Sequence, residues 1–286
     1  MSETMTKKNS ELKTRFILGP IMLLFVAGVF YVDNRWIGGG LSAAILGVLG
    51  LVGAMEFVAM FRNADIPIAK GLLLSMTALL VSSGFLFGWQ DVDRELYPLV
   101  IGAMTLLFPL ALRGLRPGAM ERGLEEMGST MLGFLLIAWP IYMAQGVAFR
   151  HLDSVLFVVL VCKGGDIGGY LAGVSFGRHK LIPHISPGKT IEGSLGSMVV
   201  SCLVAVWLRN LVLLPEVEVT LTEVILIGIM LNVTAQLGDL VESLLKRRCS
   251  VKDSSRFLPA HGGVLDLIDS LIFSFPAYLL ILIKLT

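Results

Sequence analysis

The chain has 286 residues, of which 55% are hydrophobic and only 16% are charged. A mean hydropathy of +0.79 excludes a soluble globular domain, because such domains carry about 25% charged residues. The net charge of +1 says little, since in a membrane protein the placement of the charges carries the information. Three cysteines without motif spacing are interpreted as reduced packing residues. We therefore predict an all-α, polytopic membrane protein.

Apolar stretches of about 20 residues, the length of a helix that crosses a bilayer, follow one another along the chain. The first, 16–32, could be the core of a signal peptide, but no small-residue cleavage site precedes Asp33, so it is interpreted as a membrane helix. With it, nine transmembrane helices are predicted: 16–32, 38–61, 69–88, 96–112, 127–148, 154–175, 194–214, 221–241 and 263–283.

Lys and Arg are distributed unevenly over the loops. With a cytoplasmic N-terminus, seventeen of them fall in cytoplasmic segments and four on the opposite side. The positive-inside rule therefore predicts this orientation. The two polar loops, 176–193 and 242–262, then face the cytoplasm, where nucleotides are found.

The two halves of the chain differ in their polar content. Up to about Phe149 the predicted helices hold mainly apolar and small residues, and Glu56, interpreted as structural or paired, is their main charge. From 154 onward, ionisable residues enter the helices at helical spacing. We predict one integral membrane domain over 1–286, with N-terminal helices in 16–149 and the chemistry in 154–284.

The predicted helix 154–175 contains Lys163 and Asp166, three residues apart in a glycine-rich run. An internal ion pair and a contact with substrate are both compatible with this spacing. In the loop that follows, Ser186-Pro-Gly-Lys189-Thr190 resembles a phosphate-contacting loop, although it lacks the spacing of a Walker A motif.

The predicted helix 221–241 has a polar face. Asn232, Gln236, Asp239 and Ser243 are four, three and four residues apart, so they lie on one side of a helix, and Lys246 extends the row. Asn232 is interpreted as an interhelical hydrogen-bonding residue.

The next predicted helix carries Asp266 and Asp269 three residues apart, with Ser270 beside them. Asp239 and Asp266 are expected at similar depth, near the cytoplasmic surface. Carboxylates hold hard divalent cations, and Lys and Arg hold phosphate oxygens. The sequence therefore predicts a site for a metal ion and phosphates at these helix ends.

This C-terminal region resembles the phosphatidate cytidylyltransferases, also called CDP-diacylglycerol synthases. The resemblance rests on about thirty residues with fixed internal spacing: Ser243-Leu-Leu-Lys246-Arg247, Lys252-Asp253, Pro259-Ala-His261-Gly262-Gly263, and Asp266 with Asp269. The stretches Gln236-Leu-Gly-Asp239 and Ser186-Pro-Gly-Lys189-Thr190-Ile-Glu192-Gly193 are similar to other recurrent parts of the family. The first 150 residues resemble it only as a set of membrane helices.

The resemblance implies transfer of CMP from CTP to phosphatidic acid, which forms CDP-diacylglycerol and pyrophosphate in phospholipid biosynthesis. It implies Mg²⁺ bound by Asp239 and Asp266; a second cation such as K⁺ is left open. The lipid phosphate is already ionised and needs no general base, so His261 is expected to orient a phosphate or Asp253. The implied catalytic residues are Lys246, Arg247, Lys252, Asp253 and His261, and the implied substrate-binding residues are Asp166, Ser186, Lys189, Gln236, Ser243 and Asp269.

The implied partners are CTP, phosphatidic acid and the lipid bilayer, without nucleic acid, in a bacterial inner membrane with the site facing the cytoplasm. A homodimer is left open. The family pattern has Arg directly after the first Asp of a final D-R-x-D, where this chain has Leu267, and Ala260 stands where Gly is usual. A catalytically impaired homologue is therefore one alternative, and a cation-coupled transporter, which also places carboxylates in the membrane, is the other.

Overall fold

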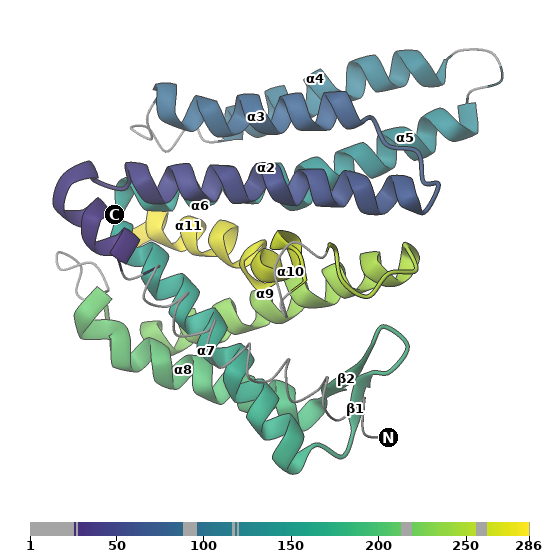
Figure 1. Ribbon diagram of the computed structural model, residues 1–286. Helices are drawn as coiled ribbons and strands as arrows, with labels where there is room; N and C mark the ends of the chain where they lie inside the picture. The colour runs from purple at the N-terminus through teal and green to yellow at the C-terminus, as the bar shows by residue number, and fades with distance from the viewer. Residues whose placement is uncertain are drawn as a thin grey trace.

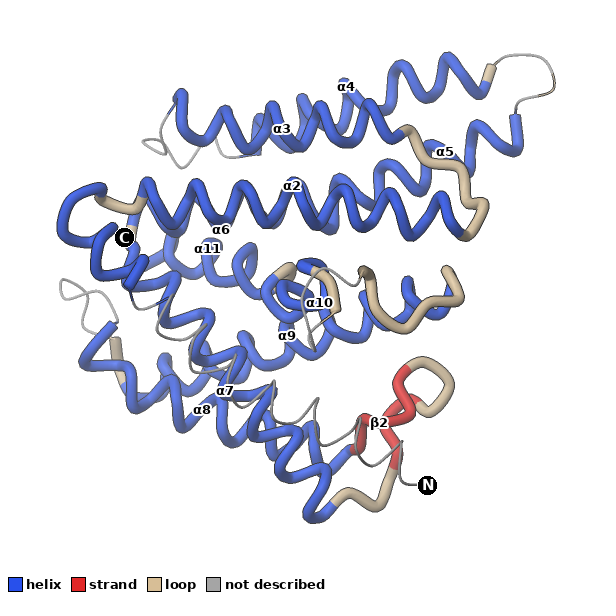
Figure 2. Tube along the Cα trace, in the orientation of Figure 1, coloured by secondary structure: helices blue, strands red, loops and turns tan. Residues whose placement is uncertain are grey.

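The computed structural model describes residues 26, 28–87, 96–115, 118, 120–212, 219–255 and 262–285. Over these ranges the chain is a bundle of helices (Figure 1) with one small β-hairpin, red in Figure 2. The elements in chain order are η1 (Asp33–Ile37), α2 (Gly40–Asn63), α3 (Lys70–Phe87), α4 (Leu96–Gly114), α5 (Met120–Gly133), η3 (Phe134–Ala138), α6 (Trp139–Arg150), α7 (Leu152–Phe176), β1 (Lys180–Ile182), β2 (Ser186–Thr190), α8 (Ile191–Val212), α9 (Leu221–Arg248), α10 (Val264–Ile268), η4 (Asp269–Leu271) and α11 (Ser274–Leu285).

The prediction of a polytopic membrane protein is confirmed. Six stretches of the described residues are helical, long and apolar enough to cross a membrane: Gly40–Asn63, Met120–Arg150, Leu152–Phe176, Ile191–Arg209, Leu221–Arg248 and Val264–Leu282. Two shorter apolar helices, Lys70–Gly84 and Ile101–Gly114, lie where the third and fourth spans are predicted. The first predicted span, 16–32, lies mostly outside the described residues, so the number nine stays a prediction.

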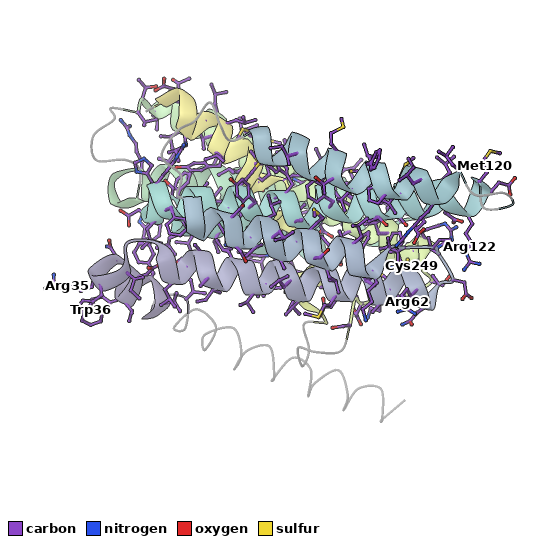
Figure 3. All side chains as sticks on the ribbon, turned by 90° about the horizontal axis from the view of Figure 1, so that it is seen from above. Arg35, Trp36, Arg62, Met120, Arg122 and Cys249 are labelled. Carbon is purple, nitrogen blue, oxygen red and sulfur yellow. The ribbon has the colours of Figure 1, made fainter. Side chains whose placement is uncertain are left out.

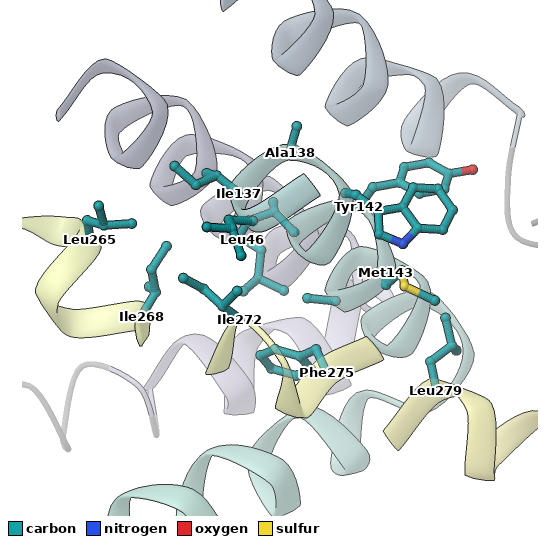
Figure 4. Close-up of a cluster of buried hydrophobic side chains, with 14 of the residues drawn as sticks. Leu46, Ile137, Ala138, Tyr142, Met143, Leu265, Ile268, Ile272, Phe275 and Leu279 are labelled. Atoms are coloured by element: carbon teal, nitrogen blue, oxygen red, sulfur yellow. The ribbon is translucent and has the colours of Figure 1, made fainter. Parts of the chain in front are cut away.

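The centre of the bundle is the continuous helix formed by α5, η3 and α6. Of its most apolar stretch 78% is buried, against 28% for α8, which places α8 at the periphery, where its apolar side chains are free to face lipid. Figure 4 shows side chains of this central helix in the core, with Ile137 beside Leu46 of α2 and Met143 beside Leu279 of α11. Lipid tails are as apolar as these side chains, so close packing and interhelical hydrogen bonds hold such a bundle together.

Helices α7, α8 and α9 approach one another closely through small residues. A Cβ atom on Gly165 of α7 would lie 2.9 Å from the Asn232 side-chain nitrogen and 3.2 Å from Ser197 Oγ. Asn232 Nδ2 donates hydrogen bonds to Ser197 Oγ (2.7 Å) and Ser201 Oγ (3.0 Å) of α8. The interpretation of Asn232 as an interhelical hydrogen-bonding residue is confirmed.

The basic loops of the described chain lie at one end of the bundle. Figure 3 shows Arg62, Arg122 and Cys249 at that end and Arg35 with Trp36 at the opposite end. The β-hairpin and the segment that follows α9 also lie at the first end (Figure 1), called here the site end. The three cysteines are free, and burial raises the pKa of the Cys249 thiol, which keeps it in the unreactive protonated form.

Asp33 binds the N-terminal end of α2, which lies away from the site end. Its carboxylate is fully buried and accepts hydrogen bonds from the backbone N–H groups of Gly39 (3.0 Å), Leu41 (3.1 Å) and Ser42 (2.7 Å). The first N–H groups of a helix have no partner within the helix. The Asp33 side chain therefore satisfies donors that would otherwise be buried without an acceptor.

We expect Asp33→Asn to lower the midpoint of thermal unfolding in detergent by several degrees. Both oxygens accept backbone N–H groups, so the amide of Asn turns its NH₂ towards a donor in either orientation, at about 1–3 kcal/mol. The matched control is Asp65→Asn, because Asp65 is exposed and its positive φ of 57° is tolerated by Asn. Equal midpoints for the two variants would contradict the role of Asp33.

Candidate active site

Helix α9 carries the polar face that its spacing predicts. It runs over 28 residues, or about 42 Å at 1.5 Å per residue, which exceeds the roughly 30 Å of a hydrocarbon core. Its last turns, which hold Asp239, Glu242, Ser243 and Lys246, are therefore expected at or beyond the membrane surface at the site end. The predicted span 221–241 ends where these polar residues begin.

Three carboxylates meet at this end of α9. One oxygen atom from each of Asp239, Glu242 and Asp269 can be chosen so that all three atoms lie within 4.8 Å of one another. Asp239 and Glu242 are three residues apart on α9, and Asp269 comes from η4, the 3₁₀ turn within the last span. We call these three residues the carboxylate triad. Glu242 is buried, and the other two are partly exposed.

A break in the last span brings Asp269 to α9. The predicted helix 263–283 is divided into α10, η4 and α11, and η4 packs against α9 at Gly238. A Cβ atom at position 238 would collide with the backbone carbonyl oxygen of Asp269. Only a glycine lets the two backbones come this close, so Gly238 sets the position of Asp269 relative to the other two carboxylates.

We expect Gly238→Ala to slow the CMP transfer that the sequence resemblance implies by about a hundredfold, while the protein still inserts into membranes. The added methyl group pushes Asp269 away from Asp239 and Glu242, and a displacement of about 1 Å can reduce a rate by this factor. Turnover per milligram of purified, monodisperse protein measures the effect. Gly71→Ala is the control, because no atom lies within 4 Å of the site of its Cβ; an equal loss in both variants would contradict the proposed cause.

A lysine lies beside each member of the triad. Lys189 Nζ of β2 lies 2.5 Å from Asp239 Oδ2, and Lys163 Nζ of α7 lies 3.9 Å from Asp269 Oδ1. Lys246, one turn after Glu242 on α9, forms an ion pair with it. Carboxylates this close repel one another, and the three ammonium groups offset part of that charge, since Lys246 also pairs with Asp266 and Lys163 with Asp166.

Asp266 lies beside the triad and shares Lys246 with Glu242. Its Oδ1 accepts from Lys246 Nζ (2.6 Å), and its Oδ2 accepts from the backbone N–H groups of Ser254 (2.8 Å) and Gly263 (2.8 Å) and from Ser254 Oγ (2.8 Å). Asp266 is therefore linked to the triad through Lys246, which also pairs with Glu242, and the predicted sharing of a metal ion by Asp239 and Asp266 stays a prediction. Asp266 joins the start of α10, the loop after α9 and Lys246.

The predicted phosphate-contacting loop is a β-hairpin. Strand β2, which begins at Ser186, pairs antiparallel with β1, with Ser186 opposite Ile182. Arg247 Nε of α9 donates to the Ile185 carbonyl oxygen (3.1 Å). Together with the Lys189–Asp239 ion pair, this contact fastens the hairpin to α9 beside the triad.

Other predicted site residues take part in contacts within the protein. Gln236 Nε2 donates to Asn232 Oδ1 (2.5 Å), and its Oε1 accepts from Ser194 Oγ (2.5 Å), which links α9 to α8. Ser243 Oγ donates to Asp239 Oδ1 (3.3 Å). Asp166 accepts from Lys163 (3.3 Å).

The predicted residues of the loop after α9 are described only in part. Lys252 and Asp253 are exposed at the site end. His261 lies outside the described residues. The roles predicted for these three residues stay predictions.

Glu56 reaches this region from the other half of the chain. Its Oε1 accepts from Ser255 Oγ (2.7 Å) and the Val264 N–H (3.0 Å), and its Oε2 accepts from Ser254 Oγ (3.1 Å) and the Leu265 N–H (2.8 Å). The residue is only 7% exposed. Glu56 is therefore structural, as expected, but its structural role is to hold the loop and α10, which carry Asp266.

Glu242 is not among the site residues predicted from the sequence. A signal was present, because Glu242 lies three residues after Asp239 and four before Lys246, and such spacing places all three on one face of a helix. No comparable signal linked Glu56 to residues about 200 positions away.

The carboxylate triad fits a hard divalent cation. Mg²⁺ binds oxygens at about 2.0–2.1 Å in octahedral geometry, which sets opposite oxygens about 4.2 Å apart and adjacent ones about 3 Å apart. Atoms within 4.8 Å of one another reach these distances when the three side chains close around the ion. Both Glu242 oxygens are buried, and outside the ion pair with Lys246 neither has a hydrogen-bond donor among the described residues. Buried carboxylate oxygens without donors suit metal coordination.

Comparison with known proteins identifies relatives along almost the whole chain. A profile described as "Cytidylyltransferase family" matches residues 13–285. A phosphatidate cytidylyltransferase of Bacillus subtilis (strain 168) is 31% identical over 265 residues, which cover 85% of this chain and 94% of that protein.

Further relatives match the chain over less than half of its length. A phosphatidate cytidylyltransferase of Staphylococcus aureus (strain COL) is 44% identical over 135 residues, 46% of this chain and 50% of that protein. A protein of Escherichia coli (strain K12) called "Uncharacterized protein YnbB" is 41% identical over 124 residues, 43% of this chain and 40% of that protein.

Proposed function

The chain belongs to the cytidylyltransferase family, and on that premise we propose that it transfers CMP from CTP to phosphatidic acid. The products are CDP-diacylglycerol, a precursor of phospholipids, and pyrophosphate. The relative from Bacillus subtilis, matched over 94% of its length, supports this choice of substrates.

The observation that carries the proposal is the carboxylate triad with its three lysines. Both substrates are anionic, so a site that joins them has to supply positive charge. Lysines paired with carboxylates can exchange those partners for phosphate oxygens once a cation neutralises the carboxylates. Such a site at the end of a membrane bundle is open to a lipid headgroup and a water-soluble nucleotide at once.

The proposed metal ligands are Asp239, Glu242 and Asp269. Mg²⁺ bound by these residues would supply positive charge against the phosphates. This proposal differs from the pair of Asp239 and Asp266 that the sequence resemblance implies. Asp266 takes a positioning role instead, because it fixes Lys246 and the loop after α9.

In the reaction, an oxygen of the lipid phosphate forms a bond to the α-phosphorus of CTP. The bond from that phosphorus to the oxygen bridging to the β-phosphate breaks, and pyrophosphate leaves with the electron pair. The attacking oxygen is already ionised, so no residue has to remove a proton. Lys189 and Lys246 hold phosphate oxygens, and Arg247 holds the hairpin that carries Lys189.

We also propose nine spans in one membrane domain, with a cytoplasmic N-terminus and the site in 154–284. The basic loops share the site end (Figure 3), so the positive-inside rule directs that end towards the cytoplasm, where CTP is found. Since the relatives are bacterial, the proposed location is the bacterial cell membrane.

The test is release of pyrophosphate by purified protein reconstituted in liposomes. We expect release only when CTP, phosphatidic acid and Mg²⁺ are all present, with CDP-diacylglycerol formed in equal amount. ATP in place of CTP and diacylglycerol in place of phosphatidic acid are the matched controls. Pyrophosphate without CDP-diacylglycerol, or no release under any of these conditions, would refute the assignment.

A further inference from the structure

Lys163 is a charged side chain within the long apolar helix α7. A lone charge inside a membrane span costs at least about 2.5–3.5 kcal/mol, so such residues are paired or functional. Lys163 Nζ lies 3.3 Å from Asp166 Oδ2 on its own helix and 3.9 Å from Asp269 Oδ1 on η4. It also donates to Ser270 Oγ at 2.7 Å.

This arrangement leaves one proton of the ammonium group available. A lysine has three N–H donors, and Ser270 and Asp166 accept two of them. Among the described residues the next acceptor is Asp269 at 3.9 Å, beyond hydrogen-bonding distance. The Lys163 and Asp166 side chains are 33% and 44% exposed, so this ion pair is not sealed inside the bundle.

The second observation is Leu267. In the family pattern that the chain resembles, an arginine follows the first aspartate of the last motif, and here Leu267 takes that position. The side chain at 267 therefore supplies no positive charge. Lys163 contacts Asp269 and Ser270, two and three residues further along, and brings a cation to the same motif from another helix.

We propose that Lys163 binds a substrate phosphate oxygen and supplies the positive charge that Leu267 lacks, a role that rests on the proposed transferase function. Its contacts with Asp166 and Ser270 hold the ammonium group 3.9 Å from Asp269 of the triad, and the third N–H is available to an anion bound there. Both the nucleotide and the lipid carry such an oxygen. Replacing Lys163 weakens the binding of whichever substrate carries the contacted phosphate, and this effect distinguishes the nucleotide from the lipid.

The experiment compares Lys163→Met, Lys163→Arg, Leu267→Arg and the double variant Lys163→Met/Leu267→Arg in liposomes. For Lys163→Met we expect kcat/KM to fall ten- to a hundredfold, the range for loss of a charged hydrogen bond. Lys163→Arg should retain most of the activity, and the double variant should recover at least tenfold over Lys163→Met. A raised KM for CTP alone identifies the nucleotide phosphate, and a raised KM for phosphatidic acid alone identifies the lipid phosphate.

The midpoint of thermal unfolding separates this role from a purely structural ion pair. We expect Lys163→Met to keep its midpoint within about 2 °C of the unaltered protein, because the Lys163–Asp166 pair is partly exposed and such pairs contribute little to stability. A midpoint that falls in parallel with activity would overturn the proposal, as would full activity of Lys163→Met or an inactive Lys163→Arg variant that is folded. So would a folded double variant no more active than Lys163→Met.

Failure of the proposed transferase function can be told apart from failure of the Lys163 proposal. If the unaltered protein releases no pyrophosphate, the proposed function fails. Equilibrium binding of labelled CTP and of phosphatidic acid to the unaltered and Lys163→Met proteins then still tests the phosphate contact. Equal affinities of the two proteins for both ligands would overturn it.

Discussion

Replacing Asp239 with Asn should reduce turnover by about a thousandfold or more. Asp239 is the member of the triad that also pairs with Lys189 at 2.5 Å, so the substitution removes a proposed metal ligand and the ionic partner of the hairpin together. The charge that a bound metal sets against a transferring phosphoryl group is worth several kcal/mol, and each 1.4 kcal/mol is a factor of ten in rate. Pyrophosphate release at saturating Mg²⁺ measures this loss.

The control for Asp239→Asn is Asp153→Asn, an aspartate in the first turn of α7, at the opposite end of that helix from the hairpin. Mn²⁺ binding followed by electron paramagnetic resonance adds a readout that does not depend on turnover. Asp239→Asn should weaken Mn²⁺ binding, whereas Asp153→Asn should leave it unchanged. Unaltered turnover and Mn²⁺ affinity in a folded Asp239→Asn variant would remove Asp239 from the metal site.

Glu56→Gln should lower both stability and turnover, although Glu56 belongs to the N-terminal half of the chain. Each of its two carboxylate oxygens accepts one backbone N–H, from Val264 or from Leu265. The NH₂ of Gln therefore faces a donor in either orientation, and the buried groups left unpaired cost about 2–4 kcal/mol. Thermal unfolding should occur at a lower temperature. Turnover should fall at least tenfold, because α10, which carries Asp266, is held less firmly once Glu56 is replaced.

The matched control for Glu56→Gln is Glu121→Gln, because Glu121 is exposed at the start of α5. It should change neither quantity. A Glu56→Gln protein with the stability and turnover of this control would show that α2 does not support the site. Lower stability with unchanged turnover would limit Glu56 to the fold.

Much of the site follows from local periodicity. Asn232, Gln236, Asp239, Ser243 and Lys246 share one face of α9 because their spacing matches the 3.6-residue turn of a helix. Glu242 obeys the same rule and could have been assigned from it. Membrane spans follow for a similar reason, since length and apolarity are properties of contiguous residues.

The sequence by itself therefore determined three features: a polytopic helical membrane protein, the polar face of α9, and charged residues gathered at the cytoplasmic ends of the C-terminal helices. Only the tertiary structure decided which carboxylates meet. Asp269 reaches α9 through a break in the last span and through Gly238, which admits the Asp269 carbonyl oxygen. Lys163, Lys189 and Glu56 arrive from α7, β2 and α2. Such contacts depend on helix packing between residues distant along the chain, and spacing within one helix carries no information about them.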